Sequence, residues 1–134
     1  MNTAQESLQK YFGYDTFRPL QQEIVKDVLD KKNVFVLMPT GGGKSLCYQL
    51  PSIILTGTTI VISPLISLMK DQVDALNMSG IKASFLNSSL TSLEQKKVIQ
   101  ELQTNEISLL YVAPERLAQP GFIDILKGID INFF

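Results

Sequence analysis

The chain has 134 residues, of which 45% are hydrophobic and 19% charged, and its formal net charge is −1. This composition is that of one folded domain and excludes a disordered tail or a collagen-like polymer. With no histidine and a single cysteine, Cys47, the sequence excludes a Ser-His triad, a histidine zinc site and an internal disulfide. No apolar run reaches the about 18 residues of a membrane span, and no signal peptide is apparent, so we expect a cytosolic protein.

The first third of the chain is expected to hold two helices and a strand. Capping-box spacing at residues 3–6 predicts a short helix that Gly13 ends, and Pro19 is expected in the first turn of a second helix. Residues 34–38 (VFVLM) form a continuous apolar run. Such a run predicts a strand that is buried on both faces.

From there strands are expected to alternate with helices. Apolar runs at 59–63, 83–86 and 109–112 predict strands, and helical spacing at 65–76 and 122–126 predicts helices. Capping-box spacing from Thr91 to Glu94 predicts the start of a further helix. This order indicates an α/β fold with a mostly parallel sheet and helices on both faces. The chain stops inside a last strand-like segment, Ile129 to Phe133. We therefore expect a piece of a longer protein, with a docked C-terminal strand as the alternative.

A glycine-rich segment, residues 38–45 (MPTGGGKS), lies between the first predicted strand and a helical segment. Its glycines let backbone N–H groups surround a phosphate, and the helix start adds partial positive charge. Lys44 is expected to reach the β- and γ-phosphates and Ser45 to hold Mg²⁺. A glycine turn with a solvated lysine is the alternative. The expected phosphate-binding residues are Thr40, Gly41, Gly42, Gly43, Lys44 and Ser45.

Five segments of the chain stand in the order found in RecQ-family DNA helicases, which the sequence resembles along nearly its whole length. They are 12–14 (FGY), 17–21 (FRPLQ), 38–49 (MPTGGGKSLCYQ), 63–73 (SPLISLMKDQV) and 113–117 (APERL). The general phosphate-loop pattern has glycine at the position of Met38, and a methionine there is similar to this family's phosphate loop. The resemblance implies a RecA-like P-loop NTPase fold, truncated at its C-terminal strand. Residues 1–33 would form an N-terminal helical segment, and residues 34–134 a partial first RecA-like domain.

Three residues ahead of the phosphate loop, Tyr14, Arg18 and Gln21, match this family's adenine-recognition segment. An aromatic ring or a guanidinium plane stacks on a base, and a glutamine amide pairs with its polar edge. Without the resemblance, they would be taken as ordinary surface residues. The family has glycine where Leu20 stands, a departure that we expect to be tolerated.

Residues 63–70 and 113–117 resemble the family's motifs Ia and Ib, and both follow predicted parallel strands. Ligands bind at the carboxyl ends of such strands. We expect these segments to contact the phosphates of single-stranded DNA with low sequence specificity. The alternatives are a helix cap for Ser63, a solvated lysine, and a surface ion pair of Glu115 with Arg116. The expected DNA-binding residues are Ser63, Pro64, Ser67, Lys70, Pro114, Glu115 and Arg116.

The resemblance implies an ATP-dependent 3′–5′ DNA helicase of repair and recombination, which uses ATP and Mg²⁺, with Lys44 as its catalytic residue, in the bacterial cytoplasm at the nucleoid. The family's acidic metal-holding segment, second RecA-like half and zinc-binding part fall outside these 134 residues. We therefore expect zinc only in the parent protein. The isolated chain is expected to bind nucleotide weakly and neither hydrolyse ATP appreciably nor unwind DNA.

Two other functions stay open. One is a non-catalytic nucleotide- or DNA-binding or assembly module that dimerises through its unfinished sheet edge. The other, less favoured, is a small P-loop phosphotransferase. Such an enzyme needs arginines in a lid, whereas the sequence has only Arg18 and Arg116.

Overall fold

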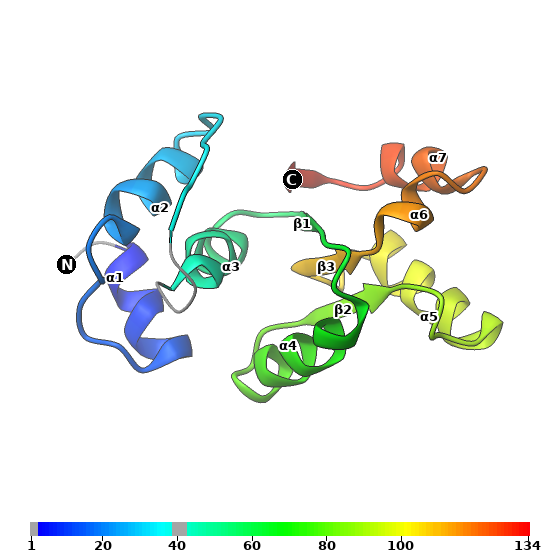
Figure 1. The fold of residues 1–134 in the computed structure, drawn as a ribbon, viewed down its shortest axis with the longest axis horizontal. Coiled ribbons are helices and arrows are strands. Elements are labelled where there is room, and N and C mark those ends of the chain that lie inside the picture. Colours follow the sequence, from blue (N-terminus) through cyan, green and yellow to red (C-terminus); the bar gives the residue numbers. More distant parts are fainter. Residues whose placement is uncertain (1–2, 39–42) are drawn as a thin grey trace. The chain divides into compact units, whose positions relative to one another are not determined.

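The computed structural model describes residues 3–38 and 43–134 (Figure 1). The chain divides into two compact units, Met1–Leu55 and Thr56–Phe134. Thr40, Gly41 and Gly42 lie outside the described residues. The predicted division after residue 33 stays a prediction.

The first unit is helical in its described part. Its elements are α1 (Thr3–Ser7), the π-helix η1 (Leu8–Phe12), α2 (Gln21–Leu29) and α3 (Lys44–Ile54). They bury a small core of Leu8, Val25, Leu46 and Leu50. Gly13 ends η1 with a left-handed φ of 75°, as predicted, because glycine adopts this conformation without a steric penalty.

The start of α2 differs from the prediction. The helix begins at Gln21, and Pro19 precedes it. Leu20 occupies the N-cap position with a left-handed φ of 71°. A turn bond from the Gln21 N–H to the Arg18 carbonyl oxygen (3.1 Å) bends the chain at this point, so Pro19 lies in the turn rather than in the helix.

The predicted buried strand at residues 34–38 is wrong for this structure. The segment carries no strand, and the side chains of Phe35 and Leu37 are 91% and 86% exposed. A strand needs a hydrogen-bonded neighbour, and β-propensity alone does not hold one. None of the described strands pairs with this segment, so its apolar side chains stay accessible.

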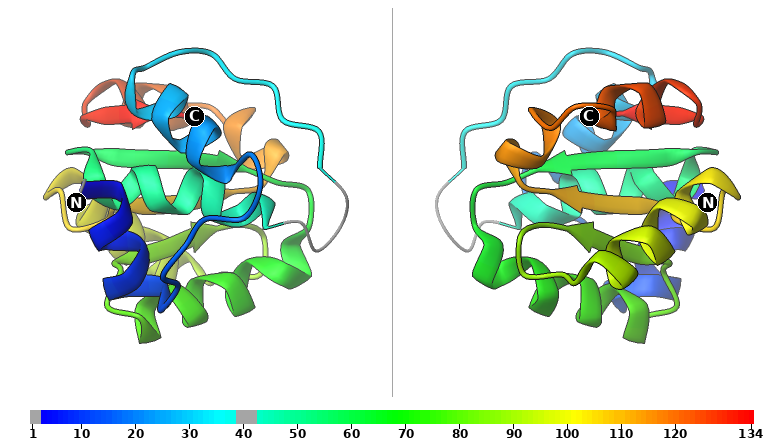
Figure 2. Two further views of the ribbon diagram at one scale, coloured as in Figure 1. Left: turned by 90° about the vertical axis from the view of Figure 1, so that its left-hand side faces the viewer. Right: turned by 90° about the vertical axis from the view of Figure 1, so that its right-hand side faces the viewer.

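The second unit contains a four-stranded parallel sheet with the order β2-β3-β1-β4. The strands are β1 (Thr58–Ile62), β2 (Ala83–Leu86), β3 (Leu109–Val112) and β4 (Ile131–Phe133), and Figure 2 shows β1, β3 and β2 running side by side. The connecting helices are α4 (Ile66–Met78), α5 (Ser92–Gln103), α6 (Pro114–Leu117) and α7 (Phe122–Lys127). The predicted α/β fold with parallel strands is confirmed.

Helices cover both faces of this sheet. Val98 and Leu102 of α5 and Phe122 and Leu126 of α7 pack against the sheet in one cluster. The buried side chains of α4 lie outside that cluster, and Figure 1 shows α4 on the other side of the sheet from α5. The sheet therefore has the layered arrangement that the alternation of elements predicts.

The pairing of β4 with β1 contains a β-bulge that places Asn132 between the two paired positions of β4. The Thr59 hydroxyl donates to Asn132 Oδ1 at 2.5 Å, and Asn132 Nδ2 donates to the Thr56 carbonyl oxygen at 3.3 Å. Because both side chains are buried, this bond fixes the register of β4 against β1. Across residues 3–38 and 43–134, the structure contains no helix of the length and apolar character that crossing a membrane requires.

Candidate nucleotide site and nucleic-acid edge

Gln21 connects the predicted adenine-recognition segment to the end of the phosphate loop. Its side chain is only 3% exposed, which the sequence did not indicate. Its Oε1 accepts from the Arg18 backbone N–H at 2.8 Å, and its Nε2 donates to the Gly43 carbonyl oxygen at 3.1 Å. Both ends of the amide are therefore used, as a buried amide requires. Three predicted site residues are brought together by these bonds.

The backbone of Gly43 has a left-handed φ of 83° at the N-cap of α3. A Cβ at this position would lie 2.3 Å from Gln21 Nε2 and 3.5 Å from Arg18 Cδ. Only glycine fits both the backbone conformation and the close approach of the Gln21 side chain. The sequence predicts that Gly43 binds phosphate, and the close contact with Gln21 is a second reason for a glycine at this position.

Lys44 and Ser45 occupy the first turn of α3, an eleven-residue helix. Lys44 is exposed and forms no ion pair with any other residue in the described part of the chain. The start of a helix, with an ammonium and a hydroxyl in its first turn, suits a phosphate group with its metal ion. The described residues of this segment therefore fit a nucleoside phosphate with Mg²⁺.

The two remaining predicted base-contacting residues are accessible. Tyr14 is more than half exposed, and Arg18 is also exposed. Cys47, one turn into α3, is buried, and its Sγ lies 3.8 Å from the Gly43 carbonyl oxygen. Burial raises the pKa of the Cys47 thiol, which keeps it protonated and suits a packing role inside α3.

The second unit brings three strand ends together at one edge of the sheet. Ile62 of β1 and Leu86 of β2 both pair with Val112 at the end of β3. The Ser63 N–H then donates to the Val112 carbonyl oxygen at 3.1 Å. The motif Ia and motif Ib segments consequently leave the sheet at the carboxyl ends of parallel strands, as predicted, and these strands are adjacent.

The motif Ia segment presents its polar groups around the start of α4. The Ser63 hydroxyl oxygen accepts from the Leu65 N–H at 3.2 Å, which is the local turn role considered as an alternative for this residue. Pro64 and Ser67 are exposed. The turn bond and the exposure leave the segment accessible to a ligand at the helix start.

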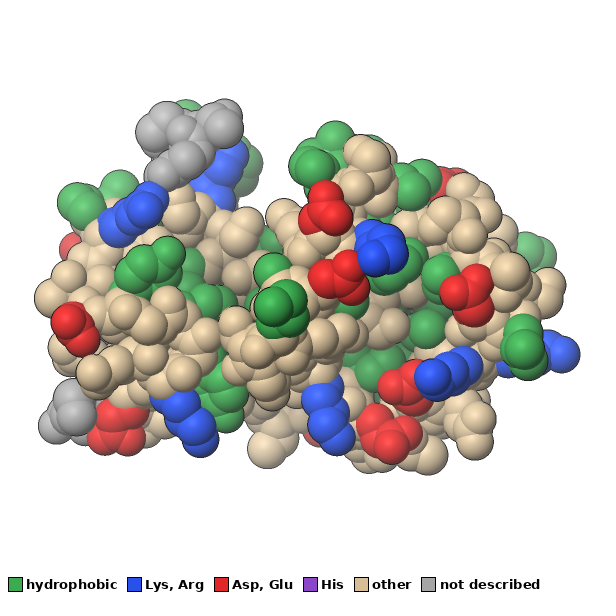
Figure 3. Space-filling model, turned by 90° about the horizontal axis from the view of Figure 1, so that it is seen from below, with side chains coloured by type: hydrophobic (Ala, Val, Ile, Leu, Met, Phe, Trp, Pro, Cys, Tyr) green, Lys and Arg blue, Asp and Glu red, His purple; other side chains and the backbone are tan. Residues whose placement is uncertain are grey.

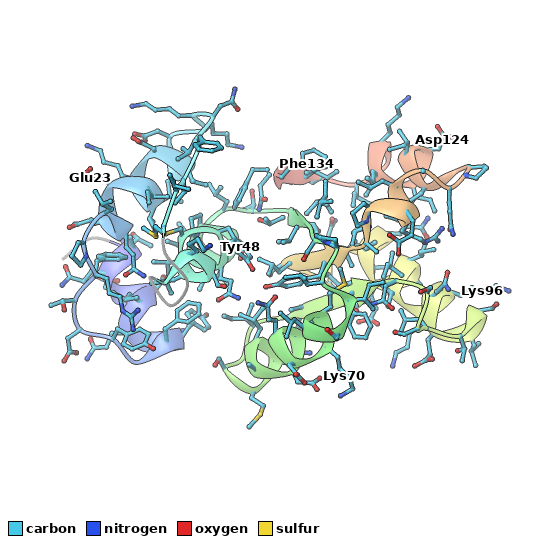
Figure 4. The ribbon with its side chains drawn as sticks, in the orientation of Figure 1. Glu23, Tyr48, Lys70, Lys96, Asp124 and Phe134 are labelled. Carbon is cyan, nitrogen blue, oxygen red and sulfur yellow. The ribbon has the colours of Figure 1, made fainter. Side chains whose placement is uncertain are left out.

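Lys70 extends from α4 into solvent (Figure 4), but its ammonium is not free. It lies 2.7 Å from Asp74 Oδ2, one helical turn further along. The hydrogen bond and the charge of Asp74 raise the pKa of Lys70. Asp74 was not singled out from the sequence, although its i,i+4 spacing from Lys70 was a signal that could have identified it.

Arg116 of α6 is half-buried and lies against an aromatic ring. Its guanidinium carbon is 5.0 Å from the centre of the Phe122 ring, and its Nη1 donates to Gln119 Oε1. The surface ion pair with Glu115 that was considered as an alternative is not formed, and both Pro114 and Glu115 are exposed. Sequence reasoning did not point to Gln119 or Phe122.

The loop after β2 ends at the same edge. Asn87 is buried, and its Oδ1 accepts from the N–H of Ser89 at 2.8 Å while its Nδ2 lies 3.4 Å from the sulfur of Met69. The bond from the Ser89 N–H to the Asn87 side chain holds residues 87–89 in a turn. Acidic and basic side chains are interspersed among the coloured residues of the face in Figure 3, in keeping with the near-neutral net charge.

A parallel sheet with helices on both faces and, in the first unit, a glycine-capped helix start that carries Lys-Ser are the features of a RecA-like P-loop fold. The sequence matches the DEAD/DEAH box helicase family over residues 18–129. The chain therefore belongs to this family.

Comparison with curated relatives shows which members of this family the chain is similar to. The chain is 49% identical over 98% of its length to the ATP-dependent DNA helicase RecQ of Bacillus subtilis, and 47% identical over 98% to that of Pasteurella multocida. It is 44% identical over 94% of its length to the ATP-dependent DNA helicase Q5 of Rattus norvegicus. The predicted resemblance to RecQ helicases is confirmed. The chain spans 22%, 21% and 13% of the length of these relatives.

Proposed function

We propose that this chain is the nucleotide-binding and DNA-contacting part of an ATP-dependent 3′–5′ DNA helicase of RecQ type that acts in DNA repair and recombination. The observation that carries this proposal is the double hydrogen bonding of Gln21, which ties the proposed adenine-recognition segment to Gly43. The identities to relatives named as ATP-dependent DNA helicases support it. The proposed site of action is the bacterial cytoplasm, at the nucleoid.

Within the nucleotide site, each residue would have a separate task. Tyr14 and Arg18 would stack on the adenine, and Gln21 would read its polar edge after exchanging its bonds to Arg18 and Gly43 for bonds to the base. Lys44 would hold the β- and γ-phosphates, Ser45 the Mg²⁺, and the backbone of residues 40–43 would surround the phosphates. ATP supplies the phosphoanhydride whose cleavage drives movement along DNA.

At the sheet edge, we propose that a single DNA strand lies across α4 and α6. Ser63, Pro64, Ser67 and Lys70 would contact successive phosphates from α4, and Pro114, Glu115 and Arg116 would do so from α6. Backbone amides, hydroxyls and cations that contact phosphates hold a strand without reading its sequence. This mode suits a motor that must step along any sequence.

Calorimetric titration with Mg·ADP tests the nucleotide site. We expect micromolar binding that is lost in Lys44→Ala, because the ammonium would contact the β- and γ-phosphates. Lys82→Ala is the matched control, since it removes one lysine charge from the other compact unit. Binding that Lys44→Ala leaves unchanged would contradict the proposal.

The isolated chain is proposed to bind nucleotide without turning it over. Phosphoryl transfer needs a metal held from two sides and a positioned water, and the sequence carries no Asp-Glu-x-His segment to provide them. Steady-state release of phosphate by the pure chain that Lys44→Ala abolishes would contradict this expectation.

An assembly role is the second proposal, and β4 is the observation that favours it. In the described sheet β4 is an edge strand, which presents unpaired backbone groups to a partner strand. We expect size-exclusion chromatography with light scattering to give a dimer whose abundance does not respond to nucleotide. A monomer at all concentrations would exclude this role.

A further inference from the structure

The side chain of Arg116 is held on its flat face and on one edge. Its guanidinium lies over Phe122, whose ring is 1% exposed and belongs to the core of the second unit. A ring packed in this way is a rigid support. On the edge, Nη1 donates to Gln119 Oε1. The support and the edge contact together leave the guanidinium little freedom to rotate.

The backbone reinforces this arrangement. The Gln119 N–H donates to the Arg116 carbonyl oxygen at 3.2 Å, and the Phe122 N–H donates to the Gln119 carbonyl oxygen at 3.3 Å. The three residues are therefore joined at intervals of three along the turn between α6 and α7. Their relative placement is set by the main chain before any ligand arrives.

The charge of Arg116 is not neutralised by this contact. The ion pairs formed among the described residues join Lys32 with Asp27 and Lys70 with Asp74. The Nε of Arg116 is buried and has no hydrogen-bond partner within residues 3–38 and 43–134. An aromatic face and an amide oxygen orient the guanidinium without cancelling its charge. The remaining N–H groups keep their ability to bind an anion.

We propose that Phe122, together with Gln119, is a positioning residue that orients Arg116 toward a DNA phosphate at the end of β3. The proposal rests on the proposed DNA contact of α6 and adds the residues that set its geometry. Because the fixed guanidinium loses little side-chain entropy when it binds, orientation by Phe122 strengthens the phosphate contact.

The test compares Phe122→Leu with Leu126→Val, a matched control that perturbs the same core cluster from the same helix. Binding of a fluorescein-labelled oligothymidylate is measured by anisotropy. We expect Phe122→Leu to weaken binding roughly three- to tenfold, in the range of a partly desolvated cation–π contact, and Leu126→Val to leave it unchanged. Equal affinities of the two variants would overturn the proposal.

A second readout keeps the test independent of core damage. The ¹⁵N heteronuclear Overhauser effect at Arg116 Nε reports how ordered that side chain is. We expect a high value in the wild type, a reduced value in Phe122→Leu and a smaller reduction in Gln119→Ala. The last variant alters an exposed side chain. An effect that Phe122→Leu does not reduce would overturn the proposal. A wild-type chain that binds no oligonucleotide would instead overturn the proposed DNA contact, and the order of Arg116 would then decide the role of Phe122.

Discussion

The side-chain amide nitrogen of Gln21 lies 3.1 Å from the carbonyl oxygen of Gly43, 22 residues away in the sequence. Through this bond, the residue proposed to read the adenine also holds the backbone that leads into the phosphate-binding helix. A substitution of Gln21 or of Gly43 should therefore affect both the stability of the first unit and nucleotide binding.

Gly43→Ala should lower the free energy of unfolding by about 2 to 3 kcal/mol, because the left-handed backbone is strained with a Cβ and the Gln21 bond is displaced. Gly13→Ala is the matched control, since Gly13 has a similar φ of 75° but nothing within 4 Å of its added Cβ. We expect it to cost about 1 kcal/mol. Urea titration measures both, and equal losses would contradict a role for the Gln21 contact.

Leu20→Gly should make the chain more stable by about 0.5 to 1 kcal/mol. The side chain is 59% exposed and its φ is 71°, so little burial is lost and a strained backbone is relieved, although glycine adds freedom to the unfolded chain. Leu20→Ala keeps the Cβ and should bring no gain. Thermal unfolding of the two variants separates them, and the same shift in both would rule out backbone strain as the cause.

Asp74→Asn should increase the affinity for an oligothymidylate roughly two- to fivefold at low salt, because it releases Lys70 from its exposed ion pair. Asp71→Asn removes the same charge from the same helix but contributes only a weaker, longer-range effect on the pKa of Lys70. We expect a smaller gain from it in the same anisotropy titration. If the two variants gain equally, net charge rather than the ion pair controls binding.

Low pH should destabilise the start of α5, because the Glu94 carboxylate becomes protonated. Thr91 and Glu94 form a capping box, whose hydrogen bonds lower the pKa of the Glu94 carboxyl. A lowered pKa in the folded state stabilises the protein above the ordinary value of 4.5, and this stabilisation is lost as the pH falls through the folded value. Melting temperatures between pH 6 and about 3 should fall more steeply for the wild type than for Glu94→Gln. Parallel profiles would show that the cap does not depend on this charge.

Local features of the sequence were sufficient to predict much of the fold. The capping box of Thr91 and Glu94, the glycine that ends η1, and the apolar runs that became β1, β2 and β3 lie where they were expected. Such features depend on neighbours a few residues away, and their physical chemistry is visible in a short stretch of sequence.

The sequence predicted which residues belong to the candidate site but not which residues they contact. The resemblance to RecQ-family helicases identified Gln21, Lys70 and Arg116 as functional candidates. The structure adds that Gln21 is buried against Gly43, that Lys70 is paired with Asp74, and that Arg116 lies over Phe122. The Gln21 contact joins positions far apart in the chain, and the Arg116 contact depends on the path of the turn between α6 and α7, which spacing alone does not specify.

The sequence by itself determined the order of elements from β1 to β3, the capping box of α5 and the glycine that ends η1, because these follow from propensity, periodicity and side-chain chemistry. Only the tertiary structure decided that residues 34–38, although apolar and β-branched, form no strand in the described sheet. It also decided that β4 pairs with β1 through a bulge at Asn132. A strand and its register exist only when a partner supplies the hydrogen bonds, and the partner is chosen by the packing of the whole unit.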